Sequence, residues 1–160
     1  MLLHARLPSR PEDPGCSRSP AVCLLRRRRR HRSGRHTVPL MLDGGSIVAV
    51  SSLGAVRAIP NYAAVGASKA ALESLVRHLA LELGPRGIRV NAVSAGVVDT
   101  DALRHFPNRE EILASAARVP AGRMLTADDV ADAVLLLVSP LAGMILGHTL
   151  VVDGGYSILG

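Results

Sequence analysis

The chain has 160 residues, of which 48% are apolar and only 2% aromatic. This length allows one ordinary domain with a sizeable core, and the aliphatic composition is typical of an α/β protein with buried parallel strands and excludes a fully disordered chain. The net charge of +6 suggests a nucleic-acid or membrane binder, but residues 1–38 carry +8 and the remainder carries −2. The basic character therefore belongs to the N-terminal segment alone.

Residues 1–43 are rich in Arg, Pro, Ser and His and include five consecutive arginines, Arg26 to Arg30. Arg clusters bind phosphate, so a nucleic-acid-binding arm or a targeting peptide is one interpretation. The arginines are not interleaved with aromatic residues or glycines, which favours a disordered or artefactual extension and argues against nucleic-acid binding. The two cysteines, Cys16 and Cys23, lie here without the partners of a metal site or a disulfide framework. We therefore expect no metal site, and because the folded region has no cysteine, we expect a reducing, cytoplasmic location. The sequence has no apolar run of the ~20 residues that a membrane span needs and no continuous apolar run at its start, so we expect neither a membrane span nor a secretory signal.

Three short apolar runs in residues 44–160 predict buried parallel strands, over residues 46–52, 88–93 and 148–152. An Asp-Gly-Gly turn signal precedes the first run and another follows the last. We expect no strand before residue 44. The strand over residues 46–52 should then lie at an uncovered edge of a three-stranded sheet.

A long helix is predicted from Pro60-Asn61 to about Leu83, because apolar side chains recur there at three- and four-residue spacings. Gly84-Pro85 ends this helix.

Two shorter helices begin at patterns that resemble capping boxes. These are Asn108 with Glu111, for a helix through residue 117, and Thr126 with Asp129, for a helix that ends before residue 140. The resulting order of strand, helix, strand, helix pair and strand predicts right-handed crossovers and a parallel sheet.

Tyr62 and Lys69 lie seven residues apart on the predicted long helix, which is nearly two turns, so both side chains project from one face. In the first turn, Tyr62 would lie near the positive end of the helix macrodipole and near the ammonium, and both stabilise negative charge on the phenol oxygen. Ser52 ends the preceding strand, where α/β sheets place ligand-facing residues. From spacing alone, three ordinary structural side chains remain an alternative.

Two longer segments resemble the short-chain dehydrogenase/reductase family: Asn61-Tyr62-Ala-Ala-Val-Gly66-Ala-Ser-Lys69-Ala-Ala-Leu and Gly84-Pro-Arg-Gly-Ile-Arg89-Val-Asn91-Ala-Val-Ser-Ala-Gly96. Most members place the active-site Tyr four residues before the Lys, where this chain has Val65. A Tyr seven residues before the Lys resembles the bacterial enoyl-acyl carrier protein reductases. Ser52, ten residues before the Tyr, is similar to the type III, NADPH-dependent group, since type I enzymes usually carry a second Tyr there.

The resemblance implies a partial, Rossmann-like doubly wound parallel sheet over residues 44–160, the C-terminal half of such a domain. It also implies an oxidoreductase that reduces the trans-2 double bond of enoyl-acyl carrier protein thioesters in fatty-acid synthesis. Tyr62 would contact the substrate thioester carbonyl or its enolate, Lys69 would hydrogen-bond the nicotinamide ribose, and Ser52 would help to shape the site.

The same resemblance implies cofactor contacts at Gly96, Val98 and Thr100, the last two with the nicotinamide carboxamide and the pyrophosphate region. NADPH or NADH is the implied cofactor, and an acyl carrier protein or CoA thioester the implied substrate. The full-length form is expected to be a homo-oligomer. Residues 101–117 correspond to a mobile substrate-binding loop and helix.

One departure from the family is that the sequence has no Gly-rich turn between a strand and a helix to hold the pyrophosphate. A truncated form of uncertain activity is therefore expected. Two alternatives stay open: a short-chain ketone or alcohol oxidoreductase of the 3-oxoacyl reductase kind, and a non-catalytic remnant with a basic nucleic-acid-binding arm.

Overall fold

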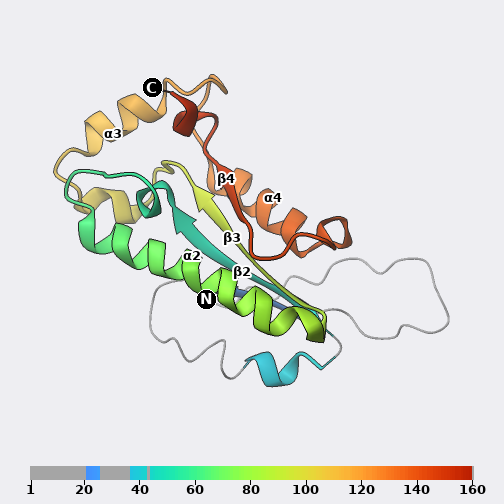
Figure 1. Ribbon diagram of the computed structural model, residues 1–160. Coiled ribbons are helices and arrows are strands. Elements are labelled where there is room, and N and C mark those ends of the chain that lie inside the picture. Colours follow the sequence, from blue (N-terminus) through green and yellow to red (C-terminus); the bar gives the residue numbers. More distant parts are fainter. Residues whose placement is uncertain (1–20, 26–36, 43, 160) are drawn as a thin grey trace.

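The computed structural model describes residues 21–25, 37–42 and 44–159. Four parallel strands form one sheet in the order β1-β2-β3-β4. Their bounds are Ala21–Leu25 for β1, Gly45–Ser52 for β2, Ile88–Ala95 for β3 and Thr149–Val152 for β4. The fold is thus the parallel α/β arrangement of a Rossmann-like domain, as predicted from the alternation of strands and helices (Figure 1).

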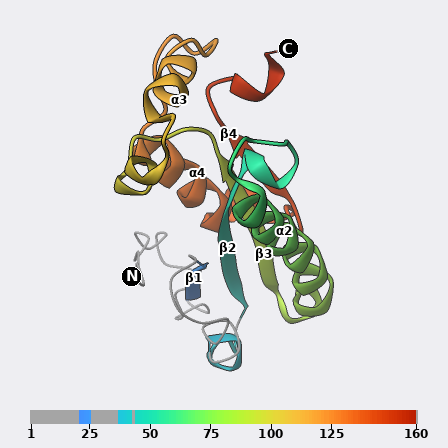
Figure 2. The same ribbon diagram turned by 90° about the vertical axis from the view of Figure 1, so that its left-hand side faces the viewer.

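Helices cover both faces of this sheet. Figure 2 shows α2 (Ala63–Leu83) on one side and α4 (Ala127–Val138) on the other, with α3 (Arg109–Ala116) beyond one end of the sheet. Side chains from β2 and β3 alternate between two apolar clusters. The cluster on the α2 side includes Ile47, Ala49, Val76, Ala80, Leu83, Ile88 and Val90, and the cluster on the α4 side includes Val48, Val93, Leu137 and Val138. Burial on both faces explains why the central strands are continuous apolar runs.

The strand β1 corrects the expectation that the strand over residues 46–52 lies at the sheet edge. It pairs with β2 in parallel from Ala21↔Gly45 to Leu25↔Ala49, so β2 is an internal strand. Its sequence, Ala-Val-Cys-Leu-Leu, is a short apolar run, and five residues beside an arginine tract are a weak strand signal. Residues 37–42 of the expected extension are ordered as well: they contain the 3-10 helix η1 (Val38–Leu40), and Met41, which is 1% exposed, packs in the apolar cluster on the α2 side. Residues 1–20, 26–36 and 43 of the extension lie outside the described residues.

The start of α2 also differs in detail from the prediction. Tyr62 is the residue before the first helical position, with φ −118° and ψ 5°, and does not lie inside the first turn. The preceding Asn61 has φ +58°, a left-handed conformation that Asn adopts more readily than most residues. This turn directs the chain from the loop after β2 into α2.

The two predicted capping boxes have different outcomes. The Thr126 hydroxyl accepts from the Asp129 backbone N–H at 3.3 Å, and an Asp129 carboxylate oxygen accepts from the Thr126 backbone N–H at 2.8 Å, so this box is confirmed. Asn108 precedes α3 but makes no capping hydrogen bond, so the box with Glu111 is wrong. Thr126 has the extended backbone that N-caps normally adopt, whereas Asn108, at φ −101° and ψ 31°, does not. Within the described ranges, none of the helices is both long and apolar enough to span a membrane.

Candidate active site

Three consecutive residues at the carboxyl end of β2 each contact one residue of α2 or its cap. The Tyr62 hydroxyl donates to Ser52 Oγ at 3.3 Å, and Lys69 Nζ donates to the Val50 carbonyl at 2.6 Å. Between them, Ser51 Oγ donates to Glu73 Oε1 at 2.5 Å. The structure therefore brings together Ser52, Tyr62 and Lys69, the three predicted catalytic residues.

Two glycines allow the Tyr62 ring to lie close to the loop after β2. A short 3-10 helix, η2 (Leu53–Ala55), follows the strand, and Ser52 Oγ accepts from the Gly54 backbone N–H at 3.3 Å. A Cβ atom on Gly54 would lie 2.4 Å from Tyr62 Cε1, and one on Gly66 would lie 2.5 Å from the Gly54 carbonyl oxygen. Any larger side chain at these two positions would push α2 and the Tyr62 ring away from the strand end.

One residue of the segment predicted to contact substrate lies beside Tyr62. Phe106 follows the 3-10 helix η4 (Asp101–His105), and its ring centroid lies 5.9 Å from that of Tyr62 with an interplanar angle of 33°. Both side chains are half-buried. This contact gives the phenol one apolar neighbour and links it to the η4–α3 segment.

The predicted cofactor-contacting residues follow the carboxyl end of β3. Gly96 donates its backbone N–H to the Val152 carbonyl at 2.9 Å, and a Cβ atom there would lie 2.8 Å from Asp153 Cβ. Val98 forms an isolated parallel bridge with Leu125, and the exposed Thr100 precedes η4 without a capping hydrogen bond from its side chain. The close packing against Asp153 is sufficient to explain why position 96 is a glycine. Val98 and Thr100 follow the carboxyl end of β3, which is the strand next to β2.

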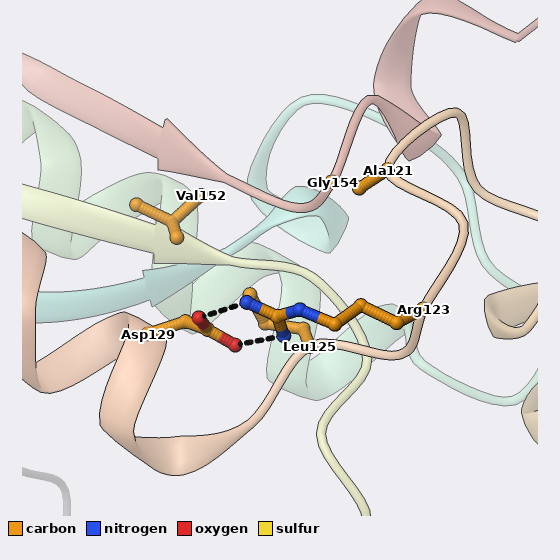
Figure 3. A pocket seen from close by; sticks show the side chains of 6 residues that line it. All are labelled: Ala121, Arg123, Leu125, Asp129, Val152 and Gly154. Carbon is orange, nitrogen blue, oxygen red and sulfur yellow. Dashed lines mark hydrogen bonds and ion pairs between the residues drawn. The ribbon is translucent and has the colours of Figure 1, made fainter.

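A shallow hollow of about 190 Å³ lies beside α4, and none of the predicted site residues line it. Figure 3 shows its lining, which comprises Ala121, Arg123, Leu125, Asp129, Val152 and Gly154. Arg123 and Asp129 form an ion pair at 2.6 Å across it. The hydrogen bond from Arg123 and those from Thr126 hold the pKa of Asp129 well below its usual range. These groups already stabilise the start of α4, so we assign the hollow a structural role.

Sequence reasoning missed two buried carboxylates. Glu73 is 8% exposed and lies on the stripe of α2 that carries Tyr62 and Lys69. Asp153, also 8% exposed, follows β4 and accepts from the backbone N–H groups of Gly155 and Ser157 at 2.8 and 2.7 Å. The available signal for Glu73 was its spacing, four residues after Lys69 on the same helix face.

Opposing effects set the pKa of Asp153. Burial alone would raise it, but the hydrogen bonds from Ser157 and Gly155, with the nearby charge of Arg57, outweigh burial and hold the pKa below its ordinary value. Arg57 also donates to the Ser157 carbonyl. The loop after β2 is thereby tied to the turn after β4.

A parallel α/β sheet with a Ser, a Tyr and a Lys gathered at the carboxyl end of one strand defines the short-chain dehydrogenase/reductase class. Within that class, the chain belongs to the enoyl-(acyl carrier protein) reductase family, whose sequence profile matches residues 31–157. The strand β1 lies outside the matched residues.

Relatives of known activity match at high identity. The chain is 48% identical over 128 residues to 1-cyclohexenylcarbonyl-CoA reductase of Streptomyces collinus, a match that spans 78% of this chain and 46% of that protein. It is 46% identical over 123 residues to the NADH-dependent enoyl-[acyl-carrier-protein] reductase of a Nostoc species, which covers 76% of this chain and 48% of the relative.

Solved structures of the family superpose on the same region. The Bacillus cereus enoyl-acyl carrier protein reductase, determined with NADP+ and an indole naphthyridinone, gives a TM-score of 0.76 at 39% identity. That match covers 79% of this chain and 50% of the other. The Aquifex aeolicus enzyme gives a TM-score of 0.74 with the same identity and coverage. The chain thus spans about half the length of the relatives it matches.

Proposed function

We propose that this chain provides the substrate-facing and nicotinamide-facing half of an NAD(P)H-dependent enoyl-thioester reductase. The observation that carries the proposal is the contact of the Tyr62 hydroxyl with Ser52, with Lys69 seven residues further along the same helix face. Family membership supports it, because relatives with this region are named as reductases of enoyl thioesters.

The donor set suits the nicotinamide end of the implied cofactor. The ammonium of Lys69 can donate to ribose hydroxyls, and the exposed Thr100 hydroxyl, which is not used as a cap, suits a phosphate oxygen. The backbone of Val98 would meet the carboxamide. Gly96 would keep the chain close to that group as it leaves β3. When bound, the nicotinamide supplies a hydride to the β-carbon of the enoyl thioester.

The residues of this chain would stabilise the charge that the reduction creates. Negative charge develops on the thioester oxygen. The Tyr62 hydroxyl, which donates a hydrogen bond to Ser52 in this structure, would donate it to that oxygen instead. Lys69 adds positive charge on the same helix face. Ser52 would position the phenol, since its Oγ is itself held by the Gly54 backbone N–H. The α-carbon is protonated afterwards.

The thioester carrier is proposed only as a class. One relative is named for a CoA thioester and another for an acyl carrier protein thioester, so the shared chemistry is a double bond conjugated to a thioester carbonyl. NADPH and NADH both remain in the proposal. The homo-oligomeric state and the cytoplasmic location also remain predictions.

The main alternative is a ketone or alcohol oxidoreductase of the same class. Such enzymes would need a hydroxyl four residues before Lys69, where Val65 offers none. A substrate comparison separates the two. Residues 31–160 would be joined to the N-terminal half of the Nostoc reductase, and crotonyl thioester would be compared with acetoacetyl thioester by the loss of nicotinamide absorbance.

We expect this hybrid protein to reduce the crotonyl double bond and to leave the acetoacetyl carbonyl. Preference for the acetoacetyl substrate would establish the alternative. A folded hybrid that binds the cofactor but reduces neither substrate would refute both. The S. collinus relative, joined at the equivalent position, is the matched control for the joint itself.

A further inference from the structure

Glu73 is a buried carboxylate that the proposed chemistry does not use. It lies eleven residues after Tyr62 and four after Lys69, so all three fall on one stripe of α2. Further along the same stripe lie Val76 and Ala80, which pack in the apolar cluster against the sheet. Burying a charge among such neighbours is costly unless a specific partner compensates.

The partner of Glu73 is the middle residue of the strand end that holds the site. Ser51 donates to Glu73, the carbonyl of Val50 accepts from Lys69, and the hydroxyl of Ser52 accepts from Tyr62. Fixing Ser51 therefore fixes both neighbouring acceptors.

Among the described residues, this part of β2 has a strand neighbour on one side alone. The pairing with β1 ends at Leu25↔Ala49, so within the described residues Val50–Ser52 are paired only with β3 on the other side. Ser51 faces α2, as do Ile47 and Ala49 before it, and its register partner on β3, Ser94, is also buried. The bond from Ser51 to Glu73 is thus a tertiary anchor for the strand end on the α2 side.

We propose that Glu73 is a positioning residue of this site: by accepting from Ser51 it fixes the end of β2 against α2 and so places the acceptors that orient Lys69 and Tyr62. The inference rests on the proposed function, because it concerns the same site. A carboxylate is a stronger acceptor than a neutral group, so this bond is suited to hold the strand end in place.

Lys69 offers a direct measurement, because it is the only lysine in the chain. Its ε-amine can be followed in the 160-residue protein by the rate of acylation with an N-hydroxysuccinimide ester, read by mass spectrometry of the peptide that contains it. The ε-ammonium signal of 15N-lysine-labelled protein gives a second readout. Neither measurement needs cofactor or substrate.

The decisive variants are Glu73→Leu, Ser51→Ala and Glu73→Gln. We expect the first two to raise the acylation rate of Lys69 roughly tenfold, as the loss of one charged hydrogen bond implies. Glu73→Gln keeps an acceptor and should restore most of the protection. Glu82→Leu, which removes an exposed glutamate from the same helix, is the matched control and should leave the rate unchanged.

Stability separates positioning from a merely structural role. Replacing both partners of a buried polar pair by apolar side chains is often nearly neutral in stability, so the double variant Glu73→Leu with Ser51→Ala should unfold at a nearly unchanged urea concentration while Lys69 loses protection. Unchanged Lys69 acylation in both Glu73→Leu and Ser51→Ala would overturn the inference; if Glu73→Leu does not fold, Ser51→Ala alone decides. A hybrid enzyme without enoyl reduction, combined with the expected Lys69 response, would refute the proposed function and leave the positioning role intact.

Discussion

The hydroxyl oxygen of Tyr62 lies 3.3 Å from that of Ser52, ten residues earlier in the chain. The contact joins the residue that precedes α2 to the last residue of β2. Because Ser52 Oγ also accepts from the Gly54 backbone, the phenol is oriented by a hydroxyl that the loop itself holds. A substrate oxygen that replaces Ser52 as the acceptor would meet a donor that is already positioned.

Loss of the Tyr62 hydroxyl should impair turnover far more than cofactor binding. In the hybrid enzyme, Tyr62→Phe should lower kcat on the order of a hundredfold, or ~3 kcal/mol, while NADPH affinity changes little. The hydroxyl is needed mainly as charge develops on the thioester oxygen. Steady-state kinetics and an NADPH titration check this, with Tyr156→Phe, the other tyrosine of the chain, as the control. An unchanged kcat would remove Tyr62 from the mechanism.

Adding one methyl group at Gly54 should disturb the position of the Tyr62 ring. The new Cβ would lie 2.4 Å from Tyr62 Cε1, so Gly54→Ala must displace the ring, at a cost of about 1–3 kcal/mol in the free energy of unfolding. Urea unfolding and near-ultraviolet circular dichroism of tyrosine report the two effects. Gly84→Ala is the matched control, because its Cβ would meet only the Leu146 side chain, at 3.2 Å. Equal losses in both variants would contradict this explanation.

The parts of the fold that could be predicted from sequence are those where periodicity and local capping decide the structure. The apolar runs of β2 and β3, the stripe on α2 and the Thr126 cap of α4 are of this kind. The strand β1 was missed because five apolar residues in an arginine-rich segment are a weak strand signal, and only their pairing with β2 identifies them as a strand.

The site was predictable to the extent that its residues share one helix face. Tyr62 and Lys69 follow from their spacing, and Ser52 from its place at a strand end. Glu73 was missed because a glutamate in a helix is normally solvated, and only the approach of Ser51 shows that this one is buried. The need for glycine at position 54 likewise arises from a tertiary contact with Tyr62, and a tertiary contact cannot be predicted from the local sequence pattern.

The capping box of α4 should contribute measurably to stability. Thr126→Ala removes the acceptor of the Asp129 backbone N–H and should lower the free energy of unfolding by about 1 kcal/mol. Asn108→Ala is the natural comparison, because Asn108 occupies the same position before α3 without making a cap. Urea denaturation of both variants tests the contrast. A larger loss for Asn108→Ala would mean that the cap geometries have been misassigned.

Asp153 should make stability depend on pH in the acid range. Its pKa in the folded protein is below its ordinary value of 3.8, so the unfolded chain binds the proton more tightly than the folded one. The stabilisation is complete above the unfolded pKa and is lost as pH falls through the folded pKa. Asp153→Asn should therefore cost about 2 kcal/mol near neutral pH and reduce the loss of stability on acidification.

Urea midpoints measured at several pH values between neutrality and the acid range test this prediction. Asp132→Asn, at an exposed position of α4, is the control and should follow the unmodified protein. The prediction would be wrong if Asp153→Asn and the unmodified protein lost stability in parallel as the pH fell.

The 160-residue chain by itself should neither bind NADPH tightly nor reduce enoyl thioesters. Lys69, Val98 and Thr100 could contact the nicotinamide ribose, the carboxamide and part of the diphosphate, but the sequence has no Gly-rich turn and following helix to receive the rest of the diphosphate. We expect a Kd weaker than about 1 mM, which corresponds to less than ~4 kcal/mol of binding free energy. Titration of the purified chain into NADPH, followed by nicotinamide fluorescence, measures the affinity, and an enoyl-reductase assay on the same sample measures turnover. The hybrid of residues 31–160 with the N-terminal half of the Nostoc reductase is the positive control, since it carries the same site residues together with a nucleotide-binding half. Micromolar binding with turnover by the chain alone would show that residues 1–43 supply a diphosphate site that their sequence does not reveal.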